Sequence, residues 1–170
     1  NLRVKINCVA LKNINDDEMD NFIHWCIEKD FDLTFIETMP MGDIDGDRTE
    51  NYLPLSEYRN FLEKELTLTP SDYNTGGPSR YYNCQETGGI LGLITPLSHN
   101  FCADCNRVRI TSTGKMYMCL GQNDSADFNK LMRSGAADRD IIRLINHSIN
   151  LKPKSHDFRI DKYNNAPAVD

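Results

Sequence analysis

The sequence predicts a mixed α/β fold, in which a strand–helix–strand unit is followed by antiparallel hairpins and short helices. Two observations support this prediction. The first is that residues 2–9 alternate between apolar and polar side chains, whereas residues 19–27 repeat apolar side chains at helical spacing before a new apolar run at 33–37. The second is that short apolar runs beyond residue 78 flank turns that contain glycine, which is typical of β-hairpins.

The first strand and helix follow from this periodicity. Residues 2–9 place apolar side chains on one face and leave Lys5 and Asn7 together on the polar face. Asn15 and Glu18 have the spacing of a capping box for the helix that comes next. The apolar face of this helix comprises Met19, Phe22, Ile23, Cys26 and Ile27.

A second strand at residues 33–37 would lie parallel to the first, because the intervening helix provides a crossover. A loop rich in glycine and aspartate at residues 42–50 and a helix from about Ser56 follow. Residues 69–78 have the composition of a linker, so we place the boundary between two domains there. The predicted domains are residues 1–68 and 69–170.

The second domain is expected to contain two hairpins, two helices and a loose tail. Strand-like runs flank a Gly-Gly pair in the first hairpin and a Ser-Thr-Gly turn in the second. The expected hairpins are 80–84 with 90–95 and 107–111 with 115–120; the helices are 125–134 and 138–150, and the tail is 152–170.

Composition excludes several classes of function. The chain has 170 residues and a net charge of −6, which argues against a broad basic surface for nucleic acid or anionic membranes. It has no apolar run long enough to span a bilayer, and its first residues do not resemble a secretory signal. We therefore expect a cytoplasmic protein. Because the chain lacks an initial Met and opens directly into a strand, we also expect it to be part of a longer protein.

The six cysteines are expected to be thiols or metal ligands, because nothing in the sequence indicates export. Cys102 and Cys105 form a Cys-x2-Cys pair, and a hairpin after them would bring Cys119 within about one rung of Cys105. Three close thiolates suit a zinc ion with His99 or Cys84 as fourth ligand, or a [4Fe–4S] cluster with one open iron. These residues leave both metals open. Cys8 and Cys26, on apolar faces, are expected to pack in the core.

Basic residues next to the cysteines favour a working site. Arg107 and Arg109 share a strand face with Cys105, and two guanidinium groups beside a metal suit a phosphate-bearing ligand. Residues 101–121 carry three basic and one acidic side chain, hence a net charge of +2 within a chain of −6. The alternative is a solvated edge strand, whose outward residues are often basic.

Three motifs make the chain similar to a known family. They are Phe-Cys-x-x-Cys-Asn-Arg-x-Arg at 101–109 with Cys119, Ile-Thr-Pro-x-Ser at 94–98, and Phe-Ile-Glu-x-Met-Pro at 35–40. In this order they closely resemble the C-terminal portion of the GTP 3′,8-cyclases, the radical S-adenosylmethionine enzymes of molybdenum cofactor biosynthesis. The resemblance runs from the strand that contains Lys5 to about residue 158.

The resemblance implies a fold and a reaction. The fold would be the last part of an incomplete radical-SAM-type (β/α) barrel, followed by antiparallel hairpins that carry an auxiliary [4Fe–4S] cluster. The family is of the lyase class and converts GTP to (8S)-3′,8-cyclo-7,8-dihydroguanosine 5′-triphosphate, using S-adenosylmethionine and a second, N-terminal [4Fe–4S] cluster. An incomplete barrel would expose an apolar face, so we expect a homodimer through that face.

The resemblance also implies roles for individual residues. The auxiliary cluster would be held by Cys102, Cys105 and Cys119. The contacts to GTP would come from Lys5, Arg107, Val108 and Arg109, and the contact to S-adenosylmethionine from Met39.

The sequence departs from the family in three ways. It contains no Cys-x3-Cys-x2-Cys motif, so we do not expect this chain alone to catalyse the reaction. Thr34 stands where the family usually has an arginine that contacts GTP, and the Gly-Gly end of the family tail is absent. Two alternatives stay open, namely another radical S-adenosylmethionine enzyme with an auxiliary cluster and a non-enzymatic zinc-binding module.

Overall fold

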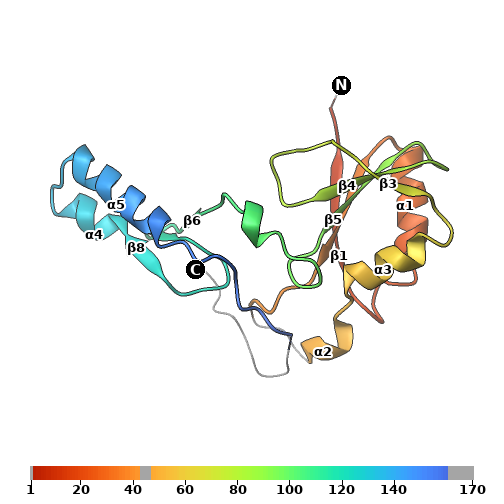
Figure 1. The fold of residues 1–170 in the computed structure, drawn as a ribbon, viewed down its shortest axis with the longest axis horizontal. Coiled ribbons are helices and arrows are strands. Elements are labelled where there is room, and N and C mark those ends of the chain that lie inside the picture. Colours follow the sequence, from red (N-terminus) through yellow and green to blue (C-terminus); the bar gives the residue numbers. More distant parts are fainter. Residues whose placement is uncertain (1, 43–46, 161–170) are drawn as a thin grey trace. The chain divides into compact units, whose positions relative to one another are not determined.

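The computed structural model describes residues 2–42 and 47–160, and these residues form two compact units (Figure 1). The first unit is formed mainly by residues up to Phe101, and the second mainly by residues 102–159. The division therefore follows Phe101 rather than residue 68, where the sequence placed it. The reason is that the strands after residue 68 join the sheet of the first unit instead of starting a new one.

The first unit contains a five-stranded mixed sheet with the order β1-β2-β5-β4-β3. The three strands β1, β2 and β5 are mutually parallel, and β4 and β3 extend the sheet in antiparallel fashion. The predicted parallel unit and the first hairpin are thus confirmed, whereas β3 was missed because it occupies the start of the apparent linker. The strands are β1 Lys5–Ala10, β2 Asp32–Glu37, β3 Leu68–Pro70, β4 Arg80–Cys84 and β5 Ile90–Ile94.

Two helices cover one face of this sheet (Figure 1). Helices α1 (Met19–Glu28) and α3 (Leu55–Leu62) bury their apolar stripes against Phe35 and its neighbours on the strands, which is the amphipathic pattern expected of surface helices. The shared core includes Ala10, Met19, Ile23, Leu33, Phe35, Leu55, Leu62, Leu91 and Leu93. The opposite face carries the alternate, more polar side chains of the same strands.

The loop expected at 42–50 contains a short helix in its second half. Helix α2 (Arg48–Asn51) begins after Asp47, whose carboxylate accepts a hydrogen bond from the amide of Thr49 at 2.9 Å. Residues 43–46 of that loop lie outside the described part of the chain.

The capping box predicted for α1 does not form. The residue that precedes the helix is Glu18, which makes no side-chain capping bond. Asn15 instead joins the turn to β1, because its carboxamide oxygen accepts from the amide of Leu11 at 2.8 Å and its nitrogen donates to the carbonyl of Val9 at 2.9 Å. The helix starts four residues after Asn15, so the side chain of Asn15 stabilises the entry loop rather than the helix end.

The second unit contains a small three-stranded antiparallel sheet and two helices. The predicted second hairpin is confirmed but is shorter than expected, and helix α5 is confirmed with its predicted ends. Helix α4 begins three residues later than predicted, because residues 125–127 pair with β7 and Asp127 then caps the helix through the amide of Lys130. The elements are β6 Arg109–Ile110, β7 Lys115–Tyr117, β8 Ser125–Asp127, α4 Phe128–Arg133 and α5 Asp138–Asn150.

The chain after α5 is less loose than the sequence suggested, as far as it is described. Residues 152–160 contain neither helix nor strand, but they pack on the segment after β7. A Cβ added to Gly121 would lie 2.9 Å from the Cβ of His156 and 3.0 Å from the ring of Phe158, so only glycine allows this approach. The rest of the predicted tail, residues 161–170, lies outside the described residues.

A buried carboxylate connects the carboxyl ends of the parallel strands. Glu37, at the end of β2, is fully buried and accepts hydrogen bonds from the amides of Leu97 at 2.8 Å and Ser98 at 3.0 Å. It also accepts from the hydroxyl of Tyr52 at 3.0 Å and the amide of Leu55 at 3.3 Å. Burial, together with the charge of Glu37, raises the pKa of Tyr52 above its ordinary value. Glu37 therefore connects β2 to the start of α3 and to the loop after β5.

None of the helices in the described residues combines the length and the apolar character needed to cross a membrane.

We predict that Glu37→Gln lowers the free energy of unfolding by about 3 kcal/mol, because the amide nitrogen of glutamine would face backbone donors that the carboxylate now satisfies. Urea denaturation followed by circular dichroism would measure the change. Glu63→Gln is the matched control. Glu63 is exposed and is bonded to Arg59 on α3, so its loss should cost less than about 1 kcal/mol. Equal losses in the two variants would contradict the role of Glu37.

Candidate functional site

The predicted site residues are divided between the two units. Lys5 and Met39 belong to the first unit, whereas the three predicted cluster cysteines and the adjoining basic segment belong to the second. The predicted site residues in the second unit are Cys102, Cys105, Arg107, Val108, Arg109 and Cys119.

The Cys-x2-Cys pair lies on a tight turn, as its spacing predicted. Cys102 opens a 3-10 turn, η1 (Cys102–Asp104), and its carbonyl accepts a hydrogen bond from the amide of Cys105 at 3.2 Å. Cys119 lies two residues after the end of β7. All three cysteines are partly exposed, and none of them forms a disulfide.

The hairpin register relates the turn to Cys119. Arg109 pairs with Tyr117 and Ile110 pairs with Met116. If this antiparallel register continued for two more residues, Cys119 would lie opposite Arg107. Arg107 is two residues after Cys105 in the sequence. The paired region ends before that point, however. Within residues 2–42 and 47–160, no three or more His, Cys, Asp or Glu side chains are grouped so that they could hold a metal ion.

The donor chemistry fits an iron–sulfur cluster. Zn²⁺ binds thiolates at about 2.3 Å and draws its four ligands around one ion. The cysteines of a [4Fe–4S] cluster bind different irons, and three are sufficient when the fourth iron takes another ligand. The second unit supplies three partly exposed cysteines that form no disulfide, whereas His99 and Cys84, the candidates for the fourth ligand of a zinc site, belong to the first unit.

The other cysteines of the first unit have the environment of core residues. Cys26 and Cys84 are buried, and Cys8 is partly buried. Burial raises the pKa of the Cys8 and Cys26 thiols, so the protonated form, which is a poor metal ligand, is favoured. The Sγ of Cys84 lies 3.6 Å from a carboxylate oxygen of Glu86.

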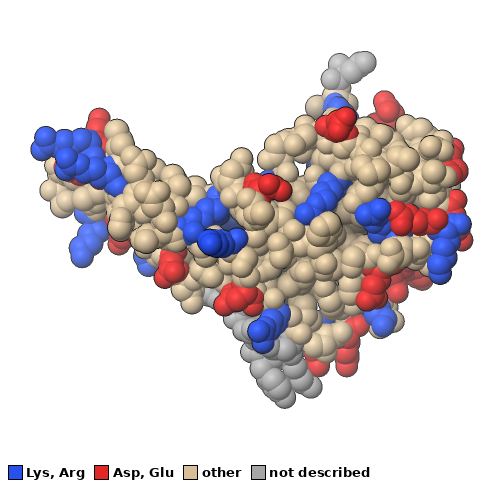
Figure 2. Space-filling model, in the orientation of Figure 1, with Lys and Arg blue, Asp and Glu red and all other residues tan. Residues whose placement is uncertain are grey.

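The basic segment that follows Cys105 is largely accessible. Arg109 and Val108 are exposed, and Arg107 is partly buried. Val108 keeps 40% of its surface exposed although it is apolar, so its side chain is available for contact. Additional Lys and Arg side chains gather over the α4–α5 end of the same unit (Figure 2).

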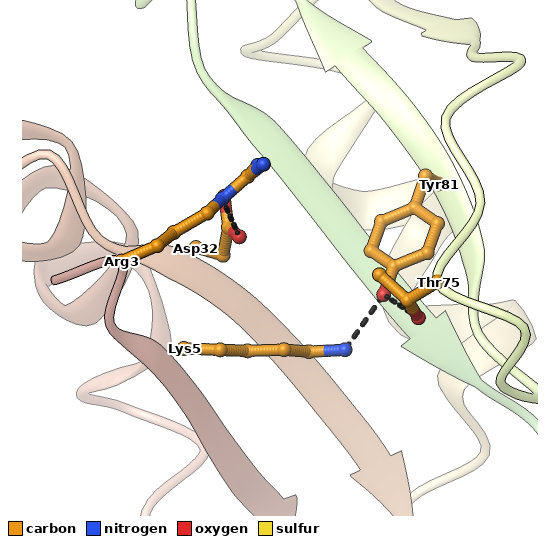
Figure 3. Close-up of polar contacts among 5 residues, drawn as sticks. All are labelled: Arg3, Lys5, Asp32, Thr75 and Tyr81. Atoms are coloured by element: carbon orange, nitrogen blue, oxygen red, sulfur yellow. Dashed lines mark hydrogen bonds and ion pairs between the residues drawn. The ribbon is translucent and has the colours of Figure 1, made fainter.

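Lys5 lies on the more polar face of the large sheet, as predicted, and is engaged there by a residue that sequence reasoning missed. Its ammonium donates to the hydroxyl of Tyr81 on β4 at 2.6 Å and lies 5.2 Å from the centre of the Tyr81 ring (Figure 3). Thr75, in the loop before β4, contacts the same hydroxyl at 3.0 Å. Beside them, Arg3 and Asp32 form a two-bonded ion pair with distances of 2.7 and 2.9 Å.

The electrostatics of Tyr81 reflect this arrangement. Burial favours the neutral phenol, but the hydrogen bonds with Lys5 and Thr75 and the charge of Lys5 outweigh burial, so the pKa of Tyr81 is below its ordinary value of 10. The sequence pattern of residues 80–84 predicted a strand. It could not predict that Tyr81 on this strand contacts Lys5, which is 76 residues away in the sequence.

Thr34 occupies the middle of the same face. Its register partners are Asn7 on β1 and Gly92 on β5, and Gly92 pairs in turn with Tyr81. Thr34 is fully buried, and its hydroxyl has no hydrogen-bond partner among the described residues. A Cβ at Gly92 would lie 2.5 Å from this hydroxyl, so glycine is required where the side chains converge.

Met39 lies just beyond the carboxyl end of β2 and is partly buried. Its carbonyl accepts a hydrogen bond from the buried guanidinium of Arg48 at 3.1 Å, which fixes the backbone of the loop.

Arg80 is a second residue that the sequence did not reveal. Its guanidinium donates to the carbonyls of His99 at 2.7 Å and Asn100 at 3.0 Å, and to the hydroxyl of Thr95 at 3.1 Å. It thereby anchors the loop that leads from β5 to Cys102 in the sequence.

Comparison with known proteins identifies relatives along nearly the whole chain. A protein from Sinorhizobium medicae is 55% identical over 168 residues, one from Rhizobium meliloti is 56% identical over 168 residues, and one from Brucella ovis is 53% identical over 168 residues. Each is named GTP 3′,8-cyclase, and each alignment covers 99% of this chain. The chain spans about half the length of these relatives, 48% in the first two and 49% in the third.

The family described as Molybdenum Cofactor Synthesis C matches residues 31–158. This region includes the predicted cluster cysteines, the arginines beside them, and the strands that carry Thr34 and Tyr81. The chain therefore belongs to the Molybdenum Cofactor Synthesis C family.

Proposed function

We propose that this chain is the substrate-binding portion of a GTP 3′,8-cyclase. The observation that supports the proposal most strongly is the identity of 53–56% to proteins of that name over 99% of the chain. In the proposed reaction, GTP becomes (8S)-3′,8-cyclo-7,8-dihydroguanosine 5′-triphosphate. S-adenosylmethionine and a second [4Fe–4S] cluster would take part, but this chain contains no Cys-x3-Cys-x2-Cys motif for that cluster. We therefore propose that the chain alone is inactive.

In this proposal the first unit is the last part of a (β/α) barrel. Three parallel strands with helices on one face support it, because parallel strands covered by crossover helices are the repeating element of such barrels. The face without these helices would then point to the barrel interior, which accounts for its polar residues Lys5, Asn7 and Tyr81. Met39, beyond the carboxyl end of β2, would contact S-adenosylmethionine.

The second unit would hold the auxiliary [4Fe–4S] cluster through Cys102, Cys105 and Cys119. When bound, this cluster supplies an open iron at which a purine can be held. The role of the protein would be to keep the three thiolates accessible, two on a tight turn and one just beyond the end of β7. Their exposure and freedom from disulfides support this role.

The nucleotide would be oriented by the basic groups of the chain. Arg107 and Arg109 can each form paired hydrogen bonds with phosphate oxygens, and Lys5 can supply a compact positive charge. Val108, between the arginines, would contact GTP through its exposed side chain. With guanidinium groups on the phosphates and the guanine held separately, the ribose between them would have little freedom to rotate.

The proposal includes a cytoplasmic location, because free thiols persist in reducing compartments. It also includes a homodimer, with a strand edge as the contact in place of the apolar face expected from the sequence, because the face of the sheet without helices carries polar side chains such as Lys5 and Asn7. In the described sheet β1 has β2 as its only neighbour, and an open strand edge favours pairing with another chain.

We predict that the chain takes up about four iron and four sulfide ions when it is incubated anaerobically with ferrous iron and sulfide, and that Cys119→Ser abolishes this uptake. Chemical analysis and visible absorption would measure the cluster. Cys8→Ser, which alters a thiol of the first unit, should load like the original chain. Full iron content in Cys119→Ser, or zinc bound in place of iron and sulfide, would refute the assignment.

We predict that Arg107→Ala and Arg109→Ala each weaken GTP binding by about tenfold or more, because each removes a charge-assisted hydrogen bond. Calorimetric titration of the cluster-loaded chain would give the dissociation constants, with ATP as the competing nucleotide. The control, Arg139→Ala, removes an exposed positive charge from α5 in the same unit. Unchanged GTP affinity, or equal affinity for ATP, would argue for a different substrate.

We predict that Lys5→Met weakens GTP binding by about tenfold and raises the pKa of Tyr81. The pKa rises because burial, which opposes ionisation of the phenol, then acts without the hydrogen bond and charge of Lys5. Nuclear magnetic resonance of labelled tyrosine during a pH titration would follow the phenol, and Tyr81→Phe would identify its signal. Lys12→Met, at an exposed loop position, is the charge control. A Tyr81 pKa that does not move would show that the pair does not interact in solution.

A further inference from the structure

Lys152 lies two residues beyond the end of α5 and bonds to both segments that carry the predicted cluster cysteines. Its ammonium donates to the carbonyl of Arg107 at 2.8 Å and to the carbonyl of Met118 at 2.6 Å. Arg107 follows Cys105 by two residues, and Met118 directly precedes Cys119. One side chain therefore joins the two arms of the loop between these cysteines.

These two hydrogen bonds lie where the regular hairpin ends. The β6–β7 pairing consists of Arg109 with Tyr117 and Ile110 with Met116, and both carbonyls bonded by Lys152 lie outside it. The ammonium thus replaces the next ladder bonds between the two arms. A clamp of this kind fixes the separation of the arms without requiring the strand spacing of a sheet.

The packing on both sides of Lys152 fixes its position. Helix α5 packs Ile141, Leu144 and Ile145 against the core of the second unit, which includes Met116 and Met118. The helix then ends in a turn in which the amide of Lys152 donates to the carbonyl of Ile149 at 3.0 Å. After it, the approach of His156 and Phe158 to Gly121 holds the following residues against the same segment.

The contacts of Lys152 are unusual for a lysine. Its two acceptors are uncharged carbonyls, and it belongs to none of the ion pairs of residues 2–42 and 47–160. It is also partly buried, although lysine usually keeps its ammonium in water. A surface role does not account for a partly buried ammonium that joins two strand ends.

We propose that Lys152 is a positioning residue for the cluster ligands, in that it clamps the carbonyls of Arg107 and Met118 and so holds Cys119 beside the turn of Cys105. The inference rests on the proposed function, because it concerns the same three thiolates. Lys152 touches neither GTP nor the sulfurs in this account. It acts through the backbone of the two arms and determines how well the unit is prepared to take up iron and sulfide.

The test compares Lys152→Met, Lys152→Arg and Lys154→Met in the 170-residue chain. Methionine keeps the length of the side chain and removes both hydrogen bonds, whereas arginine keeps the charge and two donors. Lys154→Met removes an exposed positive charge two residues away and serves as the matched control. Circular dichroism establishes that each variant is folded.

The first measurement uses the metal-free chain. Hydrogen exchange of the peptide that covers residues 105–120 should be about tenfold faster in Lys152→Met than in the original chain, and unchanged in Lys154→Met. Lys152→Arg should restore most of the protection. Identical exchange in Lys152→Met and the original chain would overturn the clamp.

The second measurement is iron and sulfide content after anaerobic loading. Lys152→Met should hold less than half the cluster of the original chain, with Lys152→Arg close to full loading. If the original chain takes up no cluster, the proposed function fails, while the exchange experiment still decides whether the clamp exists. If the original chain and Lys152→Met load equally, the positioning role is refuted although the proposed function stands.

If Lys152→Met does not fold, Lys152→Arg decides the question. Normal exchange with full loading in that variant supports the role of the two donors. Normal exchange without loading overturns it, because the clamp would then be present and without effect on the cluster.

Discussion

The first unit depends on the burial of one carboxylate. Removing the charge of Glu37 from water is costly, and the structure offsets this cost with three backbone amides and a tyrosine hydroxyl. These donors come from the loop after β5, the start of α3 and the segment between α2 and α3, so one side chain connects these segments to the end of β2. Arg80 supports the same loop farther along, through the carbonyls of His99 and Asn100.

The two faces of the large sheet differ in composition and in what they contact. One face is closed by α1 and α3 around Phe35 and provides most of the apolar burial. The other carries a rung of polar or small residues, in which Gly92 leaves room for the buried hydroxyl of Thr34. Tyr81, the register partner of Gly92, also accepts a hydrogen bond from the ammonium of Lys5, and its phenol has a lowered pKa. In the proposed function this face would bind a polyanion without affecting the core, because the residues proposed to bind it and the residues of the apolar core lie on opposite sides of the strands.

The sequence allowed prediction of the elements whose periodicity is determined by local burial. Helix α5 and the parallel pair β1–β2 were of this kind, since each buries one regular face. It did not reveal β8, whose three residues read as the start of a helix, because pairing with β7 is a tertiary effect. The cysteines and arginines of the proposed site were selected from their spacing and from the family resemblance, and their roles stay predictions. Tyr81, Arg80 and Lys152 were not selected, because each acts on atoms far away in the sequence.

The hydrogen bonds of Lys152 lie where the hairpin between the cysteines ends. A continued ladder would hold the backbone around residues 107 and 119 at the spacing of a sheet, about 4.8 Å. In the proposed function the three thiolates would bind different irons of one cluster, so the segments that carry them would not need the pairing of a sheet. The side chain of Lys152, just beyond α5, suits this arrangement, because it limits the separation of the arms while leaving the turn of Cys102 and Cys105 outside the sheet. The packing of α5, which has no direct contact with a nucleotide in this scheme, would thereby determine the geometry at which the nucleotide is held.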